Sequence, residues 1–123
     1  MKKKILVVDD EPHIVNLLKL ILQEEFVVYE AYSGGEALKL ARRVEPDMII
    51  LDLMMPNIDG LQTCITLRST PETRDTPIMV LSARSQVSDK FKSMNAGADD
   101  YMVKPFDPTE LVRRIHTSLG ISS

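Results

Sequence analysis

The sequence predicts an α/β fold, in which a doubly wound five-stranded parallel sheet is covered by helices on both faces. Short aliphatic runs alternate with amphipathic stretches from one end of the chain to the other. Such alternation implies right-handed crossovers between parallel strands. The chain has 123 residues, of which 44% are hydrophobic, and this is enough for one buried core but not for two. We therefore expect one domain, residues 1–123.

The first two strand and helix pairs are marked by apolar spacing and by a capping pattern. A strand is expected near Lys4–Val8, and the helix after it carries apolar residues three and four apart: Ile14, Leu17, Leu18, Ile21 and Leu22. A second strand near Val27–Ala31 leads to Ser33, whose hydroxyl is expected to cap a helix. Glu36, three residues later, is expected to complete a capping box. The apolar side of this helix consists of Ala37, Leu40, Ala41 and Val44.

The middle of the chain repeats the pattern with weaker helices. A third strand is expected near Met48–Leu51 and a fourth at Ile78–Leu81. The helix between them has an apolar side of Leu61, Cys64, Ile65 and Leu67. The stretch "STPETRDTP" before the fourth strand is rich in turn-forming residues. A further helix is expected at about Val87–Asn95, and Gly97 stands where a left-handed cap residue is needed.

The last pair has the clearest helix signals. A brief strand is expected around Tyr101–Val103, and Asp107 precedes Pro108 at the first position of a helix. Glu110 is expected to complete a capping box, and Gly120 to end the helix. The residues expected to be buried on this helix are Leu111, Ile115 and Leu119, whereas His116 is expected to be solvated.

Composition excludes several classes of protein. The formal net charge of -3 offers no broad basic surface for nucleic acid. The apolar runs are too short to span a bilayer, and the start of the chain does not resemble a signal peptide, so we expect no membrane association and a cytoplasmic protein. The single cysteine, Cys64, has helical apolar spacing and is expected to be a packed, reduced thiol.

Chemically active residues follow four of the five predicted strands. They are Asp9, Asp10, Asp52, Ser82 and Lys104. In a parallel sheet such residues meet at one edge, which is where open α/β sheets bind ligands. Clustered carboxylates repel one another unless a cation is present, and oxygen ligands with room for a phosphoryl group favour Mg²⁺. One aspartate could then attack phosphorus, although spacing alone does not say which.

A plainer interpretation applies to each residue alone, because aspartates often follow strands as turn formers or helix caps. The combination of three acids, a hydroxyl and an ammonium favours a functional site instead. The segment "DDEPHI" after the first strand lacks the glycines that cradle a phosphate, so nucleotide or flavin mononucleotide binding there is not expected.

Four segments, "KILVVDDEP", "PDMIILDLMMPNIDG", "PIMVLSA" and "GADDYMVKPF", closely resemble in order and spacing the receiver domain of two-component response regulators. The resemblance covers nearly the whole chain and implies the flavodoxin-like (βα)5 fold with strand order 2-1-3-4-5. It also implies that the chain ends after the receiver domain, with no output domain in it.

The resemblance assigns roles around the three aspartates. Asp52 matches the phosphoacceptor, and it would hold Mg²⁺ together with Asp10 and the backbone carbonyl of Met54. Asp9 matches the outer acid, which binds the ion through water. Lys104 would pair with the phosphoryl oxygens, and the bond to Pro105 is expected to be cis as in relatives.

The resemblance also assigns a switch. Ser82 would move toward the phosphoryl group while Tyr101 swings from an outward to an inward position, which would reshape the face formed by the fourth helix, fifth strand and fifth helix. For Tyr101 the alternative is an ordinary half-buried aromatic residue.

The implied function is a phosphorelay switch, a signalling domain and not an enzyme, although it would catalyse its own phosphotransfer and slowly hydrolyse the phosphate. The phosphoryl group would come from a sensor histidine kinase or a histidine phosphotransfer protein, and the output would pass to a downstream protein or a fused output domain. The resemblance also implies that a phosphorylation-dependent homodimer can form. Two alternatives remain: a stand-alone Mg²⁺-dependent phosphatase with an aspartate nucleophile, and a pseudo-receiver that only binds partners.

Overall fold

The computed structural model describes residues 2–53, 60–83 and 86–121, and these form five strands and five helices in alternation. Their bounds are β1 Lys4–Val8, α1 Pro12–Leu22, β2 Val27–Ala31, α2 Gly34–Val44, β3 Met48–Asp52, α3 Gly60–Ser69, β4 Ile78–Ser82, α4 Val87–Asn95, β5 Asp100–Val103 and α5 Pro108–Leu119. All neighbouring strands are parallel, in the order β2-β1-β3-β4-β5. The predicted fold class and strand order are confirmed.

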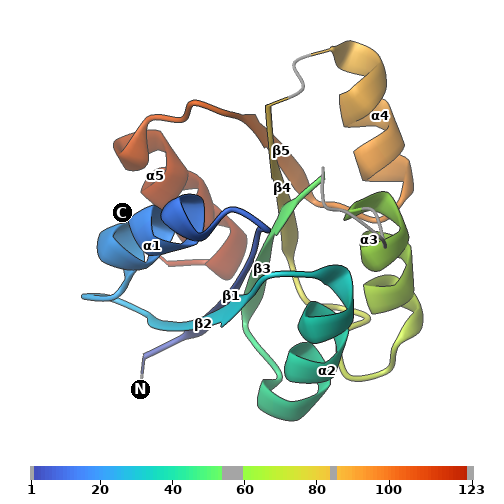
Figure 1. Ribbon diagram of the computed structural model, residues 1–123, viewed down its shortest axis with the longest axis horizontal. Coiled ribbons are helices and arrows are strands. Elements are labelled where there is room, and N and C mark those ends of the chain that lie inside the picture. The colour runs from blue at the N-terminus through green and yellow to red at the C-terminus, as the bar shows by residue number, and fades with distance from the viewer. Residues whose placement is uncertain (1, 54–59, 84–85, 122–123) are drawn as a thin grey trace.

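The sheet lies between two layers of helices. Helices α1 and α5 cover one face, and α2, α3 and α4 lie on the other (Figure 1). The core on the α1 and α5 side includes Val15, Leu18, Leu22, Leu111 and Ile115. The core on the other side includes Ala37, Ala41, Cys64 and Leu67. Because both faces of β3 and β4 are covered, every residue of these two strands is buried.

The faces of two helices differ in part from the prediction. Leu17 was expected on the buried side of α1 but is 43% exposed, and Val15 is buried instead. On α3, Ile65 is 45% exposed, whereas Thr63 and Cys64 are buried. Burial raises the pKa of the Cys64 thiol to about 11, in keeping with the packed thiol expected there. Among the described residues, no helix combines the length and apolar character needed to cross a membrane.

Side-chain caps form at the expected residues, but the predicted capping boxes do not. Ser33 Oγ accepts from the Glu36 N–H at 3.2 Å, but the Glu36 carboxylate accepts from Tyr32 N and not from the capping residue. Asp107 accepts from the N–H of Thr109, as expected of a cap. Glu110 instead takes hydrogen bonds from two arginines of its own helix, because these long cations lie one turn away: Arg113 and Arg114.

Two helix ends have backbone angles that favour glycine. The prediction for Gly97, after α4, is confirmed by its φ of 114°, and Gly120 ends α5 with a φ of 70°. Helix α2 ends differently, because its C-cap residue is Glu45 at a φ of 47°. A side chain in this left-handed region is uncommon and carries a steric cost.

Helix α4 presents its apolar side outward. Val87 and Phe91 are 70% and 64% exposed, whereas Asp89 and Ser93 are buried against the body of the protein. The hydroxyl of Ser93 donates to the Asp89 carbonyl at 2.9 Å, so this buried hydroxyl is satisfied within the helix. Burial of apolar side chains therefore contributes little to the attachment of α4.

Arg68, at the end of α3, joins three segments at the edge of the sheet opposite the carboxyl ends of the strands. Its guanidinium donates to the carbonyls of Gly97 at 2.8 Å and Thr76 at 2.6 Å, and it pairs with Asp99. Asp99 in turn accepts from the N–H of Ile78 at 2.8 Å. The arginine thus fixes the C-terminal end of α4 to the start of β4.

We predict that Arg68→Met lowers the free energy of unfolding by about 2–3 kcal/mol, because it leaves several backbone carbonyls and Asp99 without their charged partner. Arg68→Lys should recover only part of this loss, since an ammonium lacks the planar set of donors. Urea denaturation followed by circular dichroism measures the change. Arg74→Met, at an exposed position of the neighbouring loop, is the control. An equal effect in both variants would contradict the role given to Arg68.

Candidate functional site

The strand register brings the predicted site residues to one edge of the sheet. Val8 is paired with Leu51, so the next residues along these strands, Asp9 and Asp52, are neighbours. Asp52 is in turn paired with Leu81 of β4, one residue before Ser82. Ser82 pairs with Val103, the residue before Lys104. The order of the strands alone therefore gathers residues that are up to 95 positions apart in sequence.

Three carboxylates form the floor of the site. Asp9, Asp10 and Asp52 each offer an oxygen atom within 4.8 Å of the others. Asp9 and Asp52 are only 2% and 4% exposed, and Asp10 is the most accessible of the three. One oxygen of Asp9 accepts from the N–H of Glu11 at 3.0 Å, which fixes its orientation. Carboxylates this close destabilise one another unless positive charge is near.

Lys104 supplies that charge. Its Nζ donates to Asp9 at 2.8 Å and lies 3.7 Å from an oxygen of Asp52. Burial by itself would lower the pKa of Lys104, but the hydrogen bond to Asp9 and the charge of Asp52 outweigh it, so the pKa lies above the usual 10.5. The backbone N–H of Lys104 donates to the Ser82 carbonyl at 2.7 Å, and the bond from Lys104 to Pro105 is cis, as expected.

The two expected switch residues are both buried. Ser82 has no exposed surface, and it ends β4 on the same edge as Asp52. Tyr101 is 7% exposed and belongs to the core between the sheet and α2 and α3. The inward swing expected of Tyr101 would start from an outward position, which is not the position in this structure. Met54, expected to offer its carbonyl, lies outside the described residues.

Gly60 allows α3 to begin against the end of β3. Its N–H donates to the Leu53 carbonyl at 3.1 Å. A Cβ at this position would lie 2.5 Å from the carbonyl oxygen of Asp52 and 2.5 Å from the Cα of Leu53, both of which are backbone atoms. Only glycine permits this approach, which sets the backbone that carries Asp52.

The donor set of the site fits a hard divalent cation. All the candidate ligands are carboxylate oxygens, two of them from buried side chains. Mg²⁺ is usually held by one or two carboxylates and keeps several waters, so a full protein cage is not needed. Any of the three carboxylates could offer a ligand to such an ion, and Asp9 also accepts a hydrogen bond from Lys104.

Two side chains at the rim, those of Glu11 and His13, were not assigned to the site from the sequence. Glu11 lies 4.0 Å from Lys104 Nζ through one carboxylate oxygen, and its other oxygen lies 3.3 Å from His13 Nε2. The position of Glu11 directly after Asp9 and Asp10 is the signal that could have drawn attention to it.

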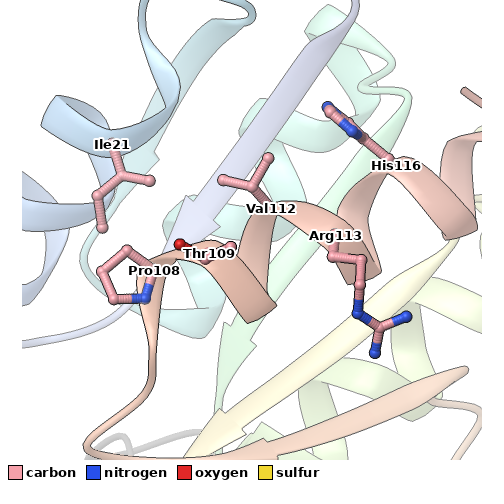
Figure 2. Close-up of a pocket in the computed structure, with 6 residues that line it drawn as sticks. All are labelled: Ile21, Pro108, Thr109, Val112, Arg113 and His116. Carbon is pink, nitrogen blue, oxygen red and sulfur yellow. The ribbon is translucent and has the colours of Figure 1, made fainter. Parts of the chain in front are cut away.

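A separate hollow of about 540 Å³ lies between α1 and α5 (Figure 2), and none of the three site aspartates lines it. It is lined by Ile21, Pro108, Thr109, Val112, Arg113 and His116. Figure 2 shows Ile21 of α1 facing α5, while Arg113 extends away from the side of α5 that carries Val112. The expectation that His116 is solvated is wrong, because its side chain is 14% exposed and pairs with Glu25 at 2.8 Å.

Comparison with known proteins gives one consistent family. The family described as "Response regulator receiver domain" matches residues 5–116. The alkaline phosphatase synthesis transcriptional regulatory protein PhoP of Bacillus subtilis is 45% identical over 97% of this chain and 49% of its own length. The transcriptional regulatory protein SrrA of Staphylococcus aureus is 43% identical over 97% of this chain and 48% of its own length. The chain thus spans about half the length of these curated relatives.

Solved structures agree with this family. A putative response regulator from Chloroflexus aurantiacus superposes with a TM-score of 0.93, at 38% identity over 98% of this chain and 99% of that one. The receiver domain of a sensor histidine kinase from Pseudomonas aeruginosa superposes with a TM-score of 0.90, at 29% identity over 98% and 99% of the two chains. The latter structure has a magnesium ion coordinated in its active-site cleft.

We predict that Lys104→Met destabilises the fold by about 2–3 kcal/mol in the presence of a chelator, because the buried Asp9 carboxylate loses its partner. The folded pKa of Lys104 is raised above 10.5, so its stabilising contribution is complete below pH 10.5 and is lost as pH rises through the folded pKa. The difference in unfolding free energy between the two proteins should therefore be constant at neutral pH and shrink in strong base. Urea titrations from about pH 8 to about pH 11.5 test this. A difference that grows over this range would contradict it.

We predict opposite effects for two glycine to alanine substitutions. Gly60→Ala should destabilise the fold by about 1–3 kcal/mol, because backbone atoms of Asp52 and Leu53 must move. Gly35→Ala, whose new Cβ would meet nothing within 4 Å, should leave stability unchanged or raise it by up to about 1 kcal/mol. Thermal unfolding measures both. Equal destabilisation by both substitutions would show that the close backbone contact at Gly60 does not exclude a side chain there.

Proposed function

This chain belongs to the response regulator receiver domain family, and we propose that it accepts a phosphoryl group on Asp52 and passes the signal on as a change of conformation. Receiver domains of response regulators are signalling domains, and the intact site supports the same role here. The observation that carries the proposal is the position of Lys104 Nζ, 2.8 Å from Asp9 and 3.7 Å from Asp52. The ammonium offsets the charge of the two carboxylates in the unphosphorylated protein, and it would also attract an incoming phosphoryl anion.

The proposed reaction is a displacement at phosphorus. A carboxylate oxygen of Asp52 attacks the phosphorus of a phosphohistidine, an O–P bond forms, and the P–N bond breaks. The electron pair of the broken bond stays on the imidazole nitrogen, and the donor histidine leaves as a neutral imidazole because its other ring nitrogen carries a proton. No oxidant or reductant is needed. Lys104 would neutralise charge on the phosphoryl oxygens, which its distance of 3.7 Å from Asp52 supports.

Mg²⁺ is the cofactor that the donor set favours. When bound, the ion would supply positive charge that draws electron density from the phosphoryl oxygens. Asp10 and Asp52 would hold it directly, with the carbonyl of Met54 as the further family ligand and Asp9 acting through water. The residues of this chain would then leave one carboxylate oxygen of Asp52 free for attack.

The product is a change of shape. A phosphoryl group adds about 1.5–2 negative charges and strong acceptor oxygens, enough to bias an element whose two states differ by a few kcal/mol. The hydroxyl of Ser82, at the end of β4, would donate to the new oxygens. A repositioned Tyr101 would alter the face of α4, β5 and α5.

The partners follow from this role. The donor would be a sensor histidine kinase or a histidine phosphotransfer protein, acting in the cytoplasm. The curated relatives are about twice as long as this chain and are described as transcriptional regulators, so a downstream protein or a fused output domain would carry the response. The receiver residues themselves would not bind nucleic acid. A phosphorylation-dependent homodimer through the α4, β5 and α5 face is part of the same proposal.

The alternatives are weaker. An aspartate-nucleophile phosphatase commonly uses a second acid two residues after the nucleophile, and that position is Met54 in this sequence. A pseudo-receiver that only binds partners would not need the acids, the hydroxyl and the lysine together. Persistent turnover of unrelated phosphomonoesters would favour the phosphatase.

We predict that acetyl phosphate or phosphoramidate with Mg²⁺ adds one phosphoryl group to this protein, and that the product is stable in acid and labile in base, as an acyl phosphate is. Asp52→Asn should remove the label, because an amide oxygen is a poor nucleophile. Intact-protein mass spectrometry and Phos-tag electrophoresis measure the modification. Asp75→Asn, at an exposed position remote in sequence, is the matched control and should label normally. Labelling that persists in Asp52→Asn would contradict the assignment of the phosphoacceptor.

A further inference from the structure

Glu11 has a fixed backbone and a side chain that the helix does not use. It is the N-cap residue of α1, but its side chain makes no capping hydrogen bond. Its N–H donates to Asp9 at 3.0 Å, and its carbonyl accepts from Ile14 at 3.0 Å and from Val15 at 3.2 Å. The backbone is therefore anchored beside the acidic cluster, while the carboxylate is available for another role.

The carboxylate of Glu11 lies on the solvent side of Lys104. Its nearest oxygen is 4.0 Å from Nζ, and its side chain is 50% exposed, compared with 13% for Lys104 and 2% for Asp9. The other oxygen lies 3.3 Å from His13, whose side chain is 73% exposed. Glu11 is thus placed where an anion arriving from solvent would approach the ammonium.

Among the residues that the structure describes, the carboxylates near Lys104 outnumber its single positive charge. Three carboxylates, those of Asp9, Asp52 and Glu11, lie within 4.0 Å of a single ammonium. The proposed chemistry uses two of them, as nucleophile and as ion ligand, but it has no task for Glu11. Its remaining physical effect is a negative potential at the entrance, which acts on any charged molecule that enters.

Resting on the proposed function, we infer that Glu11 selects among phosphodonors by charge. Its carboxylate repels small donors that arrive as dianions, such as acyl phosphates. It repels more weakly a donor in which a positive charge compensates part of the charge of the phosphoryl group. A small anionic donor reaches Lys104 through electrostatic attraction alone. Repulsion by the Glu11 carboxylate therefore lowers the rate at which this donor phosphorylates the protein. Glu11 is a specificity-determining residue in this account and takes no part in bond making.

The test compares phosphorylation rates of the wild-type protein with Glu11→Gln, Glu11→Asp and Glu24→Gln at saturating Mg²⁺. Glu24 is an exposed glutamate near the far end of α1, so its substitution removes the same charge at a distance. The donors are acetyl phosphate, a dianion at neutral pH, and phosphoramidate, whose nitrogen is protonated. The Mg²⁺ affinity and the thermal unfolding midpoint of each variant are measured separately, so that changes in ion binding or folding are not mistaken for donor selection.

Glu11→Gln should accelerate labelling by acetyl phosphate about three- to tenfold, with a smaller gain for phosphoramidate, and the gain should shrink in about 0.5 M salt. Glu11→Asp and Glu24→Gln should stay near the wild-type rate. Equal or slower labelling of Glu11→Gln, or a gain of equal size for both donors at all salt concentrations, would overturn the inference. Absence of labelling in every variant, the wild type included, would instead overturn the proposed function.

Discussion

Two almost fully buried carboxylates, Asp9 and Asp52, share one ammonium, and much of the fold serves to hold these three groups together. Like charges at this distance oppose folding, whereas the ammonium of Lys104 offsets part of that cost. Asp9 follows β1, Asp52 ends β3 and Lys104 follows β5, so no local segment could assemble them. The parallel sheet brings them together by register alone.

The opposite edge of the sheet has a complementary arrangement. There, Arg68 satisfies backbone carbonyls from two loops and pairs with Asp99, so positive charge is used to fix the chain and not to bind a ligand. At the site edge, the close approach at Gly60 fixes the backbone of Asp52 instead. One end of the sheet is thus held by a polar network that fixes the chain, while the other gathers the charged groups of the candidate site.

The sequence was sufficient for the strands, because buried parallel strands appear as continuous aliphatic runs, as at Ile78–Leu81. It was less reliable where a side chain chooses between two partners. Glu110 pairs with two arginines of its own helix and not with the capping residue Asp107. His116 contacts Glu25, which lies 91 positions away in the sequence. The acids and the lysine of the site were identifiable by their places after strands. Glu11 was not assigned to the site although it directly follows Asp9 and Asp10, since its approach to Lys104 becomes visible only in the fold.

Helix α4 combines an outward apolar side with an attachment at its C-terminal end. Its C-terminal end is fixed through Arg68 and the Gly97 carbonyl, whereas the capping residue at its other end, Gln86, provides no side-chain hydrogen bond. Because Val87 and Phe91 are already in solvent, tilting the helix about that fixed end would expose little additional apolar surface. Reorienting α4 should therefore cost less free energy in lost apolar burial than reorienting a helix whose apolar face is buried.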